Sequence, residues 1–270
     1  MQDVLPHGTT IKGEEKDDEE ALVVAASALL ATSMVSAVYA ATGSSRDPAD
    51  RRAGEVVKIE DARLKFEINA TDDDGGIQVF LDADHWKRMS IYDPRGHRIL
   101  STVTTGKMGR QGATELFMES AEPTFDELSL EALLERFPAG RYAFRGRGLD
   151  GERYVGSAVL THDLPAGPEL VSPIKGDGRQ DPDRTVVRWR PVPAANGSPI
   201  IGYQVIVVEP DTGLAALPKV TLDVMMPPTA DRLAVPKGFL KAGTEYEWEV
   251  LAIEAGGNQT LSSSTFRTSR

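Results

Sequence analysis

Three consecutive aspartates, Asp72, Asp73 and Asp74, are the residues of this chain best suited by type and spacing to hold a hard cation. Asp82 and Asp84 follow within a short distance. Calcium takes about six to eight oxygen ligands, and adjacent aspartates in one turn can supply some of them. The spacing differs from that of a calcium-binding hand, which needs a Glu at its twelfth position. Asp-Gly-Gly between two strands is ordinary turn chemistry, so we expect a hairpin turn, with calcium binding as the open alternative.

The other side chains with catalytic potential are scattered or isolated. Paired carboxylates can cleave a glycosidic bond, and Glu115 and Glu119 flank Phe117 on an expected strand, where solvated glutamates are far commoner. No serine stands in a Gly-x-Ser-x-Gly elbow. We expect Trp86 to anchor a loop in the core rather than to stack on a sugar. Four histidines lack a ligand partner at helical or strand spacing: His7, His85, His97 and His162. We therefore predict no catalytic residue, no cofactor-binding residue and no metal ligand.

Composition excludes several classes of site and partner. The 270 residues include no cysteine, which rules out disulfides, thiolate zinc sites and cysteine nucleophiles. With 41 acidic and 30 basic side chains, the formal net charge is −11. A negative surface repels phosphate backbones. The chain is thus expected to have no nucleic-acid partner.

The first 55 residues divide into three segments of different character. Residues 1–20 are polar and acidic, which predicts a disordered terminus. Residues 21–42 are uncharged and apolar, which fits a signal peptide cleaved before Ala41 or a membrane anchor, with a buried helix as the alternative. The acidic rather than basic flank argues against a standard signal. Residues 43–55 read as a polar linker. We expect an exported protein, either secreted, periplasmic or anchored at the cell surface.

Residues 56–163 show the short alternating segments of a β-domain with one helical insert. Ser129 is a good N-cap for a helix that ends before Pro138. One predicted strand alternates apolar residues with polar residues that should face water: Leu64, Lys65, Phe66, Glu67, Ile68 and Asn69. Such alternation predicts a β-sandwich-like domain with a solvated outer face.

A hairpin closes this domain, with strands at 141–147 and 154–160 joined at Asp150-Gly151. Five residues carry a likeness to a known pattern: Gly140, Tyr142, Phe144, Asp150 and Gly151. The hairpin resembles the last strands of bacterial immunoglobulin-like modules. This resemblance implies a β-sandwich.

Beyond a stiff Pro-Ala-Gly-Pro junction at 164–168, residues 169–270 contain ordered landmarks. Trp189 stands on the second expected strand, Tyr203 on the third, and Tyr246 where a tyrosine hydroxyl would bond back to the preceding loop. The stretch that begins at Tyr246 alternates apolar residues with Glu247 and Glu249, which should be solvated. This stretch of the chain resembles a fibronectin type III domain of bacterial type. No Arg-Gly-Asp adhesion motif is present at 255–258.

The sequence as a whole predicts an all-β protein with two tandem β-sandwich domains, the second of fibronectin type III and immunoglobulin-like architecture. The leading functional hypothesis is a non-catalytic, exported or membrane-tethered module that presents these domains to an unknown protein or polysaccharide. The first alternative is an accessory or catalytic part of a carbohydrate-active hydrolase, which a deep pocket with two facing carboxylates would favour. A structural spacer is the second alternative.

Overall fold

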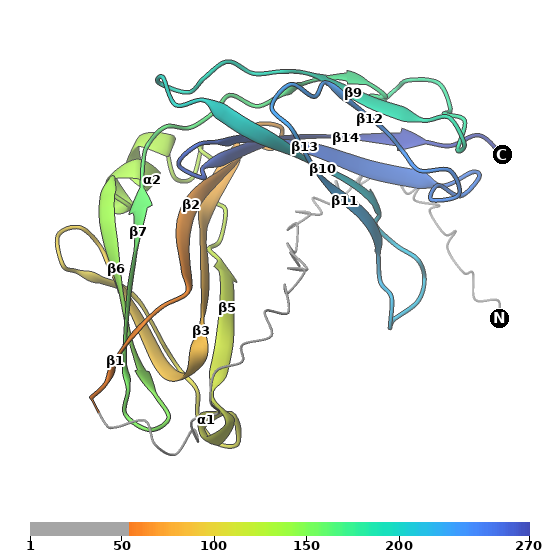
Figure 1. The fold of residues 1–270 in the computed structure, drawn as a ribbon. Coiled ribbons are helices and arrows are strands. Elements are labelled where there is room, and N and C mark those ends of the chain that lie inside the picture. The colour runs from red at the N-terminus through yellow and green to blue at the C-terminus, as the bar shows by residue number, and fades with distance from the viewer. Residues whose placement is uncertain (1–53) are drawn as a thin grey trace, which may run out of the picture. The chain divides into compact units, whose positions relative to one another are not determined.

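The computed structural model describes residues 54–270, in which strands make up nearly all of the regular secondary structure (Figure 1). The elements follow in chain order: β1 (Val56–Lys58), β2 (Asp61–Asn69), β3 (Asp74–Tyr92), β4 (Arg98–Val103), α1 (Met108–Gln111), β5 (Ala113–Glu119), α2 (Leu130–Arg136), β6 (Gly140–Gly148), β7 (Arg153–Leu160), β8 (Glu169–Ser172), β9 (Val186–Arg190), β10 (Ile200–Glu209), β11 (Val220–Met226), β12 (Arg232–Ala234), β13 (Glu245–Glu254) and β14 (Gln259–Arg267). The expected β fold is confirmed for this part of the chain.

The strands form one large sheet and one small sheet, rather than the separate sheets expected of two independent sandwiches. The large sheet has eleven strands in the order β1-β7-β6-β3-β2-β14-β13-β10-β11, with β4 and β5 also pairing with β3. The small sheet has the order β12-β9-β8. Strands β2 and β14 join the two halves of the large sheet in parallel, from Gln259 opposite Glu67 to Leu261 opposite Asn69. One continuous sheet therefore runs through both predicted domains.

The first hydrophobic core lies around the long strand β3. Its first part pairs with β2 and β5, and its second part pairs with β4 and β6. Side chains from both parts, including Leu81 and Ile91, enter one buried cluster with Phe66 and Phe144. Trp86 is 2% exposed in this cluster and its Nε1 donates to the Thr114 carbonyl at 3.2 Å. The core role expected for this tryptophan is confirmed.

The second core lies between the small sheet and strands β10 and β13. Trp189 of β9 packs beside Tyr203 of β10, with ring centroids 5.6 Å apart. The Tyr246 hydroxyl of β13 accepts a hydrogen bond from the Lys241 backbone N–H at 2.8 Å. The three aromatic landmarks expected from the sequence therefore occupy their expected strands, and the tyrosine bonds back to the preceding loop.

Two smaller sequence predictions concern the helix and the hairpin. The Ser129 hydroxyl accepts the Ala132 backbone N–H at 3.2 Å and caps α2, as predicted. Strands β6 and β7 pair antiparallel, and Gly151 takes a φ of +91° in their connection. The left-handed conformation explains why glycine follows Asp150 at this turn.

The predicted segments 1–20 and 21–42, and all but the last two residues of the linker 43–55, lie outside the described residues. Within residues 54–270, neither helix has the length and apolar character needed to cross a membrane. Signal and anchor therefore stay predictions, as do the domain limits at 163 and 169.

Hydrogen bonds tie the loop before β14 to the segment after β7. The Asn258 amide nitrogen donates to the Thr161 hydroxyl at 2.9 Å and to the Asp163 carbonyl at 3.3 Å. The Asn258 amide oxygen accepts the buried Phe66 backbone N–H at 3.0 Å. Thr260 adds a buried hydrogen bond to the Pro165 carbonyl at 2.7 Å. Thr260 therefore contacts the predicted junction at 164–168 directly, and Asn258 contacts the residues just before it.

Candidate functional site

The aspartate cluster forms the tip of the β2–β3 hairpin. Asp73 takes a φ of +55°, and the Asn69 amide nitrogen donates to Asp72 at 2.7 Å. Asp74 pairs with Asn69, whereas Asp82 pairs with Asp61, eight residues farther along β3. The strand therefore separates Asp82 from the turn, and the five aspartates considered for calcium do not come together.

The two glycines after the aspartates, Gly75 and Gly76, correct another expectation. The Asp-Gly-Gly pattern predicts turn residues, but β3 begins at Asp74, so both glycines are strand residues. A Cβ on Gly76 would lie 2.6 Å from the Ser120 hydroxyl oxygen. These glycines therefore allow the segment after β5 to lie close against β3.

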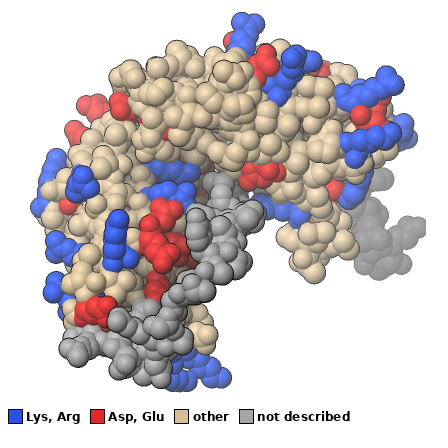
Figure 2. Space-filling view, in the orientation of Figure 1, with Lys and Arg blue, Asp and Glu red and all other residues tan. Residues whose placement is uncertain are grey.

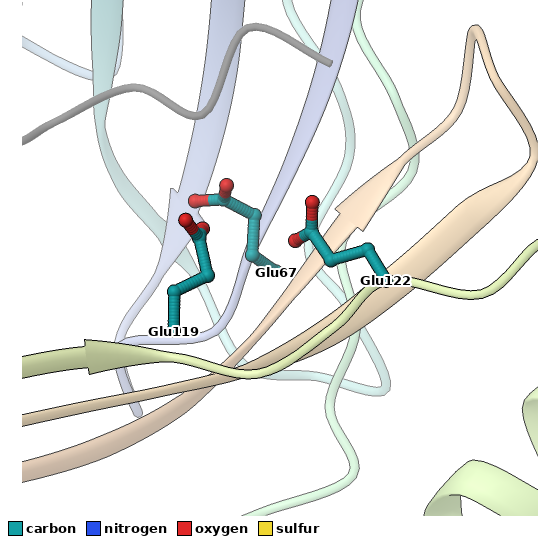
Figure 3. A group of neighbouring side chains, drawn as sticks. All are labelled: Glu67, Glu119 and Glu122. Atoms are coloured by element: carbon teal, nitrogen blue, oxygen red, sulfur yellow. The ribbon is translucent and has the colours of Figure 1, made fainter.

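That close approach brings three glutamates together. Glu67 lies on β2, Glu119 ends β5, and Glu122 follows it in the adjacent segment. One carboxylate oxygen from each lies within 4.8 Å of the others, and the side chains point toward one another (Figure 3). Sequence reasoning singled out Glu119 but paired it with Glu115, which is exposed and lies opposite Asp82. We call Glu67, Glu119 and Glu122 the glutamate cluster.

Amide side chains connect the glutamate cluster to its surroundings. Gln78 donates to Glu119 at 2.8 Å, and Gln259 of β14 donates to Glu67. Lys65 donates to the Gln259 amide oxygen at 2.7 Å. Burial lowers the pKa of Lys65 to about 8, against the opposing effect of the Glu67 charge. The cluster is therefore part of the polar contact between β2 and β14.

Burial and nearby negative charges raise the pKa of two carboxyl groups in the cluster, those of Glu67 and Glu122. Burial raises the pKa of Glu122 to about 8, with smaller contributions from the charges of Glu119, Glu67 and Asp74. Burial also raises the pKa of Glu67, although Lys65 and Gln259 act in the opposite direction. Such carboxyl groups can share protons at neutral pH.

Two glutamates predicted to face water are in fact buried. Glu67 and Glu249 are each 3% exposed. The strand alternation was predicted correctly, but the large sheet continues past β2 through β14 to β13, so Glu67 lies within the sheet and meets Gln259. The Glu249 Oε2 atom has no hydrogen-bond partner. A solvated polar face was therefore the wrong expectation for these two positions.

Replacing Glu249 with Gln is expected to reduce the pH dependence of stability. Burial, followed by the charges of Glu247 and Glu67, raises the pKa of Glu249 from 4.5 to about 8. The pKa of Glu249 is higher in the folded state than in the unfolded state. The contribution of this group to the free energy of unfolding is therefore fully present below about pH 4.5 and is lost as the pH rises to about 8. Urea unfolding at about pH 8.5 should show a gain on the order of 1–3 kcal/mol for Glu249→Gln.

The matched control for this test is Glu245→Gln, which removes an exposed carboxylate from the same strand. Near pH 4 neither variant should differ from the parent, because Glu249 is then protonated in both states. Equal pH dependence in the two variants would contradict the assigned burial of Glu249.

The glutamate cluster lies in a polar contact between strands, and Gln78 and Gln259 donate to two of its carboxylates. Here the three oxygens lie within 4.8 Å, and Glu67 is buried against Gln259. Two hollows on the described surface are lined by other residues, one around α2 and one around the β6–β7 hairpin. Neither of these two hollows is lined by a member of the glutamate cluster.

A second candidate site is basic and lies on the exposed outer side of β4, β6, β7 and the end of β3. Six exposed arginines define this arginine face: Arg88, Arg98, Arg141, Arg145, Arg147 and Arg153. In Figure 2, Lys and Arg side chains, with Asp and Glu side chains among them, lie along the left-hand side of the molecule, where β6 and β7 lie in Figure 1. The chain is acidic overall, so this surface differs in sign from the net charge.

Strand register places three arginines in one row of the arginine face. Arg88 lies directly opposite Arg147, and Arg147 lies directly opposite Arg153. Exposed valines end the row, with Val103 beside Arg88 and Val56 beside Arg153. Like charges directly opposite each other destabilise a sheet. We call Arg88, Arg147 and Arg153 the arginine row.

No acidic side chain offsets this repulsion from within the strands. Strands β4, β6 and β7, and β3 from Arg88 onward, contain no Asp or Glu. Among the described residues, none of the six arginines forms an ion pair. Arg145 lies over the Tyr92 ring at 5.2 Å, and with Arg147 and Arg153 it lines a hollow of about 520 Å³. The face is thus a basic surface whose arginines form no ion pair with the described residues.

Sequence reasoning missed the arginine face, although part of its signal was present. The hairpin was predicted, and Arg141, Arg145 and Arg147 alternate with buried residues along its first strand. Arg88 and Arg98 come from strands 40 to 60 residues earlier, and only the sheet register brings them beside the hairpin. Alternation in the hairpin alone indicated a basic strand, not a basic surface.

Comparison with known proteins gives likenesses of fold alone. No protein-family model matches the chain, and no curated protein matches it significantly. Among solved structures, the fibronectin(III)-like modules of Clostridium thermocellum CbhA are 12% identical, with a TM-score of 0.31, 82% of this chain and 92% of that chain covered. The FN1–FN3 domains of chicken CNTN1 are 12% identical, with a TM-score of 0.32, and the match covers 82% of this chain and 67% of that chain. The tetra-tandem repeat of a large adhesion protein is 13% identical, with a TM-score of 0.26, and the match covers 77% of this chain and 49% of that chain. Because all three TM-scores are below 0.5, these likenesses carry no inference about function.

Proposed function

We propose that this chain is a non-catalytic binding protein that holds an anionic partner, a protein or a polysaccharide, on its arginine face. The observation that carries the proposal is the arginine row. Three like charges stand opposite one another across three strands, without an ion pair to any described residue. Sequences that accept such a local cost do so mainly at functional sites. A bound anion would remove the repulsion and supply the missing counter-charge.

The contacts of the glutamate cluster support a binding role over the hydrolase alternative. Its oxygens are close together and tied to Gln78 and Gln259, which suits a structural contact between β2 and β14. We assign residues 169–270 to a fibronectin type III module within this proposal. The positions of Trp189, Tyr203 and Tyr246 support the assignment.

Export or tethering at the cell surface is part of the same proposal. It rests on the uncharged segment 21–42, followed by β-structure of the kind that exported binding modules use. The intact mass of the protein from its own host tests it. A species that begins near Ala41, or a full-length species in the membrane fraction, agrees with the proposal, and a full-length soluble species in the cytosol contradicts it.

Binding of soluble polyanions tests the proposed contact surface. The probes are polyglutamate, which represents an acidic protein, and polygalacturonate, which represents an acidic polysaccharide. We expect the parent to bind at least one of them in calorimetric titration at about 50 mM salt, where charge attraction is weakly screened. Replacing the whole arginine row, R88Q/R147Q/R153Q, should weaken that binding about a hundredfold, since charge-assisted hydrogen bonds are lost.

The control for the row variant removes the same charge from another surface. Arg184, Arg190 and Arg232 are exposed near or within the small sheet, and each already has an acidic neighbour. The variant R184Q/R190Q/R232Q should bind as the parent does. Failure of both polymers to bind the parent, or equal loss in the two variants, would overturn the proposed surface.

A further inference from the structure

The spacing of the arginine face favours a linear partner. Neighbouring strands lie about 4.8 Å apart, so the arginine row is a line of charge that runs across the strands. Arg145 lies two residues from Arg147 along β6, a step of about 6.8 Å. Arg141 lies four residues beyond Arg145, a further step of about 13.6 Å. The rows together form an extended array of charges on the open face of the sheet, which an extended polymer can follow more readily than a folded protein.

The chemistry of the face favours carboxylates. A guanidinium presents five N–H donors in a planar fork that fits a carboxylate through two parallel hydrogen bonds. Arg141 uses one of its nitrogens on the Ser157 hydroxyl at 2.9 Å. Arg88 and Arg153 form no hydrogen bond through their side chains with the described residues. Their donors are therefore available to a partner.

Exposed valines beside the arginines can contact the apolar C–H face of a sugar ring. Val155 and Val159 are 37% and 50% exposed. They lie directly opposite Arg145 and Arg141. A sugar ring presents C–H groups on its faces and polar groups at its edge, so a valine can contact the ring while the adjacent arginine binds its carboxylate.

Two other anionic partners fit the face less well. Single-stranded nucleic acid binds through exposed aromatic platforms, but Tyr92, the aromatic residue in the rows, is half-buried beneath Arg145. Binding to anionic membranes by a protein surface relies on large apolar or aromatic side chains that enter the interface. The exposed apolar residues of these rows are valines.

We infer that the arginine face binds a linear polysaccharide that carries carboxylate groups, with Arg88, Arg147 and Arg153 across its path and Val155 and Val159 against its rings. The inference rests on the proposed function and specifies its ligand. Each bound carboxylate would lie between neighbouring guanidinium groups and remove their repulsion.

The decisive comparison uses polygalacturonate and its fully methyl-esterified form, which keeps the sugar chain but lacks the charge. We expect the full-length protein to bind polygalacturonate at least tenfold more tightly than polyglutamate, vesicles of phosphatidylglycerol, or single-stranded DNA. The esterified polymer should bind at least a hundredfold more weakly. The variant R88K/R147K/R153K, which keeps the charge but lacks the planar fork, should lose about tenfold in affinity for polygalacturonate.

Other results would overturn the inference in distinguishable ways. Preference for polyglutamate, vesicles or DNA, abolished by R88Q/R147Q/R153Q, would contradict the polysaccharide while leaving the arginine face as the binding surface. Full affinity in the lysine variant would contradict carboxylate recognition by planar forks. Failure of the parent protein to bind any of these probes would contradict the proposed function itself. Thermal unfolding of each variant, expected to be at or above the parent's transition, shows that the sheet is intact.

Discussion

Replacing Trp189 with Ala is expected to lower the free energy of unfolding by about 3–5 kcal/mol. The side chain is 2% exposed in the second core and packs against Tyr203, so truncation leaves a cavity between the small sheet and β10. Urea unfolding, followed by tryptophan fluorescence and circular dichroism, measures the change. An effect of this size would confirm that β9 contributes its tryptophan to the core.

The matched variant is Trp189→Phe, which keeps an aromatic ring and should cost less than the alanine variant. A melting temperature that hardly moves in Trp189→Ala would contradict the register of β9 against β8 and β12. A lower m-value without a shift of the urea midpoint would instead indicate a change in the compactness of the unfolded state or a departure from two-state unfolding.

Replacing Asn258 with Ala is expected to lower the free energy of unfolding by about 2–4 kcal/mol, because this side chain makes one buried and several part-buried hydrogen bonds where β2 and β14 meet the segment after β7. Truncation leaves the buried Phe66 N–H without its acceptor and removes donors to Thr161 and Asp163. An unsatisfied buried group alone costs about 1–3 kcal/mol. We expect the single unfolding transition of residues 54–270 to broaden or separate into two, since β2 and β14 are then less firmly joined.

The control variant for the contact between β2 and β14 is Thr71→Ala. The Thr71 hydroxyl accepts the Ser263 N–H at 2.8 Å, but this contact is exposed, so its loss should cost less than about 1 kcal/mol. Calorimetric scans of both variants measure the separation. A single sharp transition in Asn258→Ala, with a cost as small as that of Thr71→Ala, would contradict a cooperative junction.

Sequence patterns predicted the features that depend on neighbours along the chain. Alternation identified the strand around Phe66 and the strand around Trp248, and Ser129 marked the start of α2. These succeed because the period of side chains in a strand, and the cap of a helix, are local properties. The tyrosine landmark succeeded for the same reason, since Lys241 and Tyr246 are five residues apart.

Features that depend on register between distant strands were not predicted. Gln259 and Glu67 are 192 residues apart, so nothing near Glu67 indicated that β14 would bury it. The arginine row likewise needs Arg88 from β3 to meet the β6–β7 hairpin. A polar residue at an outward position is predicted to face water by alternation alone, and the extent of the sheet decides whether it does.

The two candidate sites differ in how their charges are balanced. The glutamate cluster has Gln78, Gln259 and Lys65 among or beside its carboxylates, and raised pKa values relieve the remaining repulsion through bound protons. Arginine has no such relief, because it stays protonated at any physiological pH. The arginine row can lose its repulsion only through a counter-ion, which is why it, rather than the glutamate cluster, indicates a binding surface.

The salt dependence of polygalacturonate binding tests the central claim most directly. We predict that the affinity of the parent falls at least tenfold between about 50 and 200 mM salt, because several arginines displace counter-ions from the polymer. The variant R88Q/R147Q/R153Q should show both a weaker affinity and a shallower slope. An affinity that does not change with salt, or a slope that the row variant leaves unaltered, would contradict binding at the arginine face.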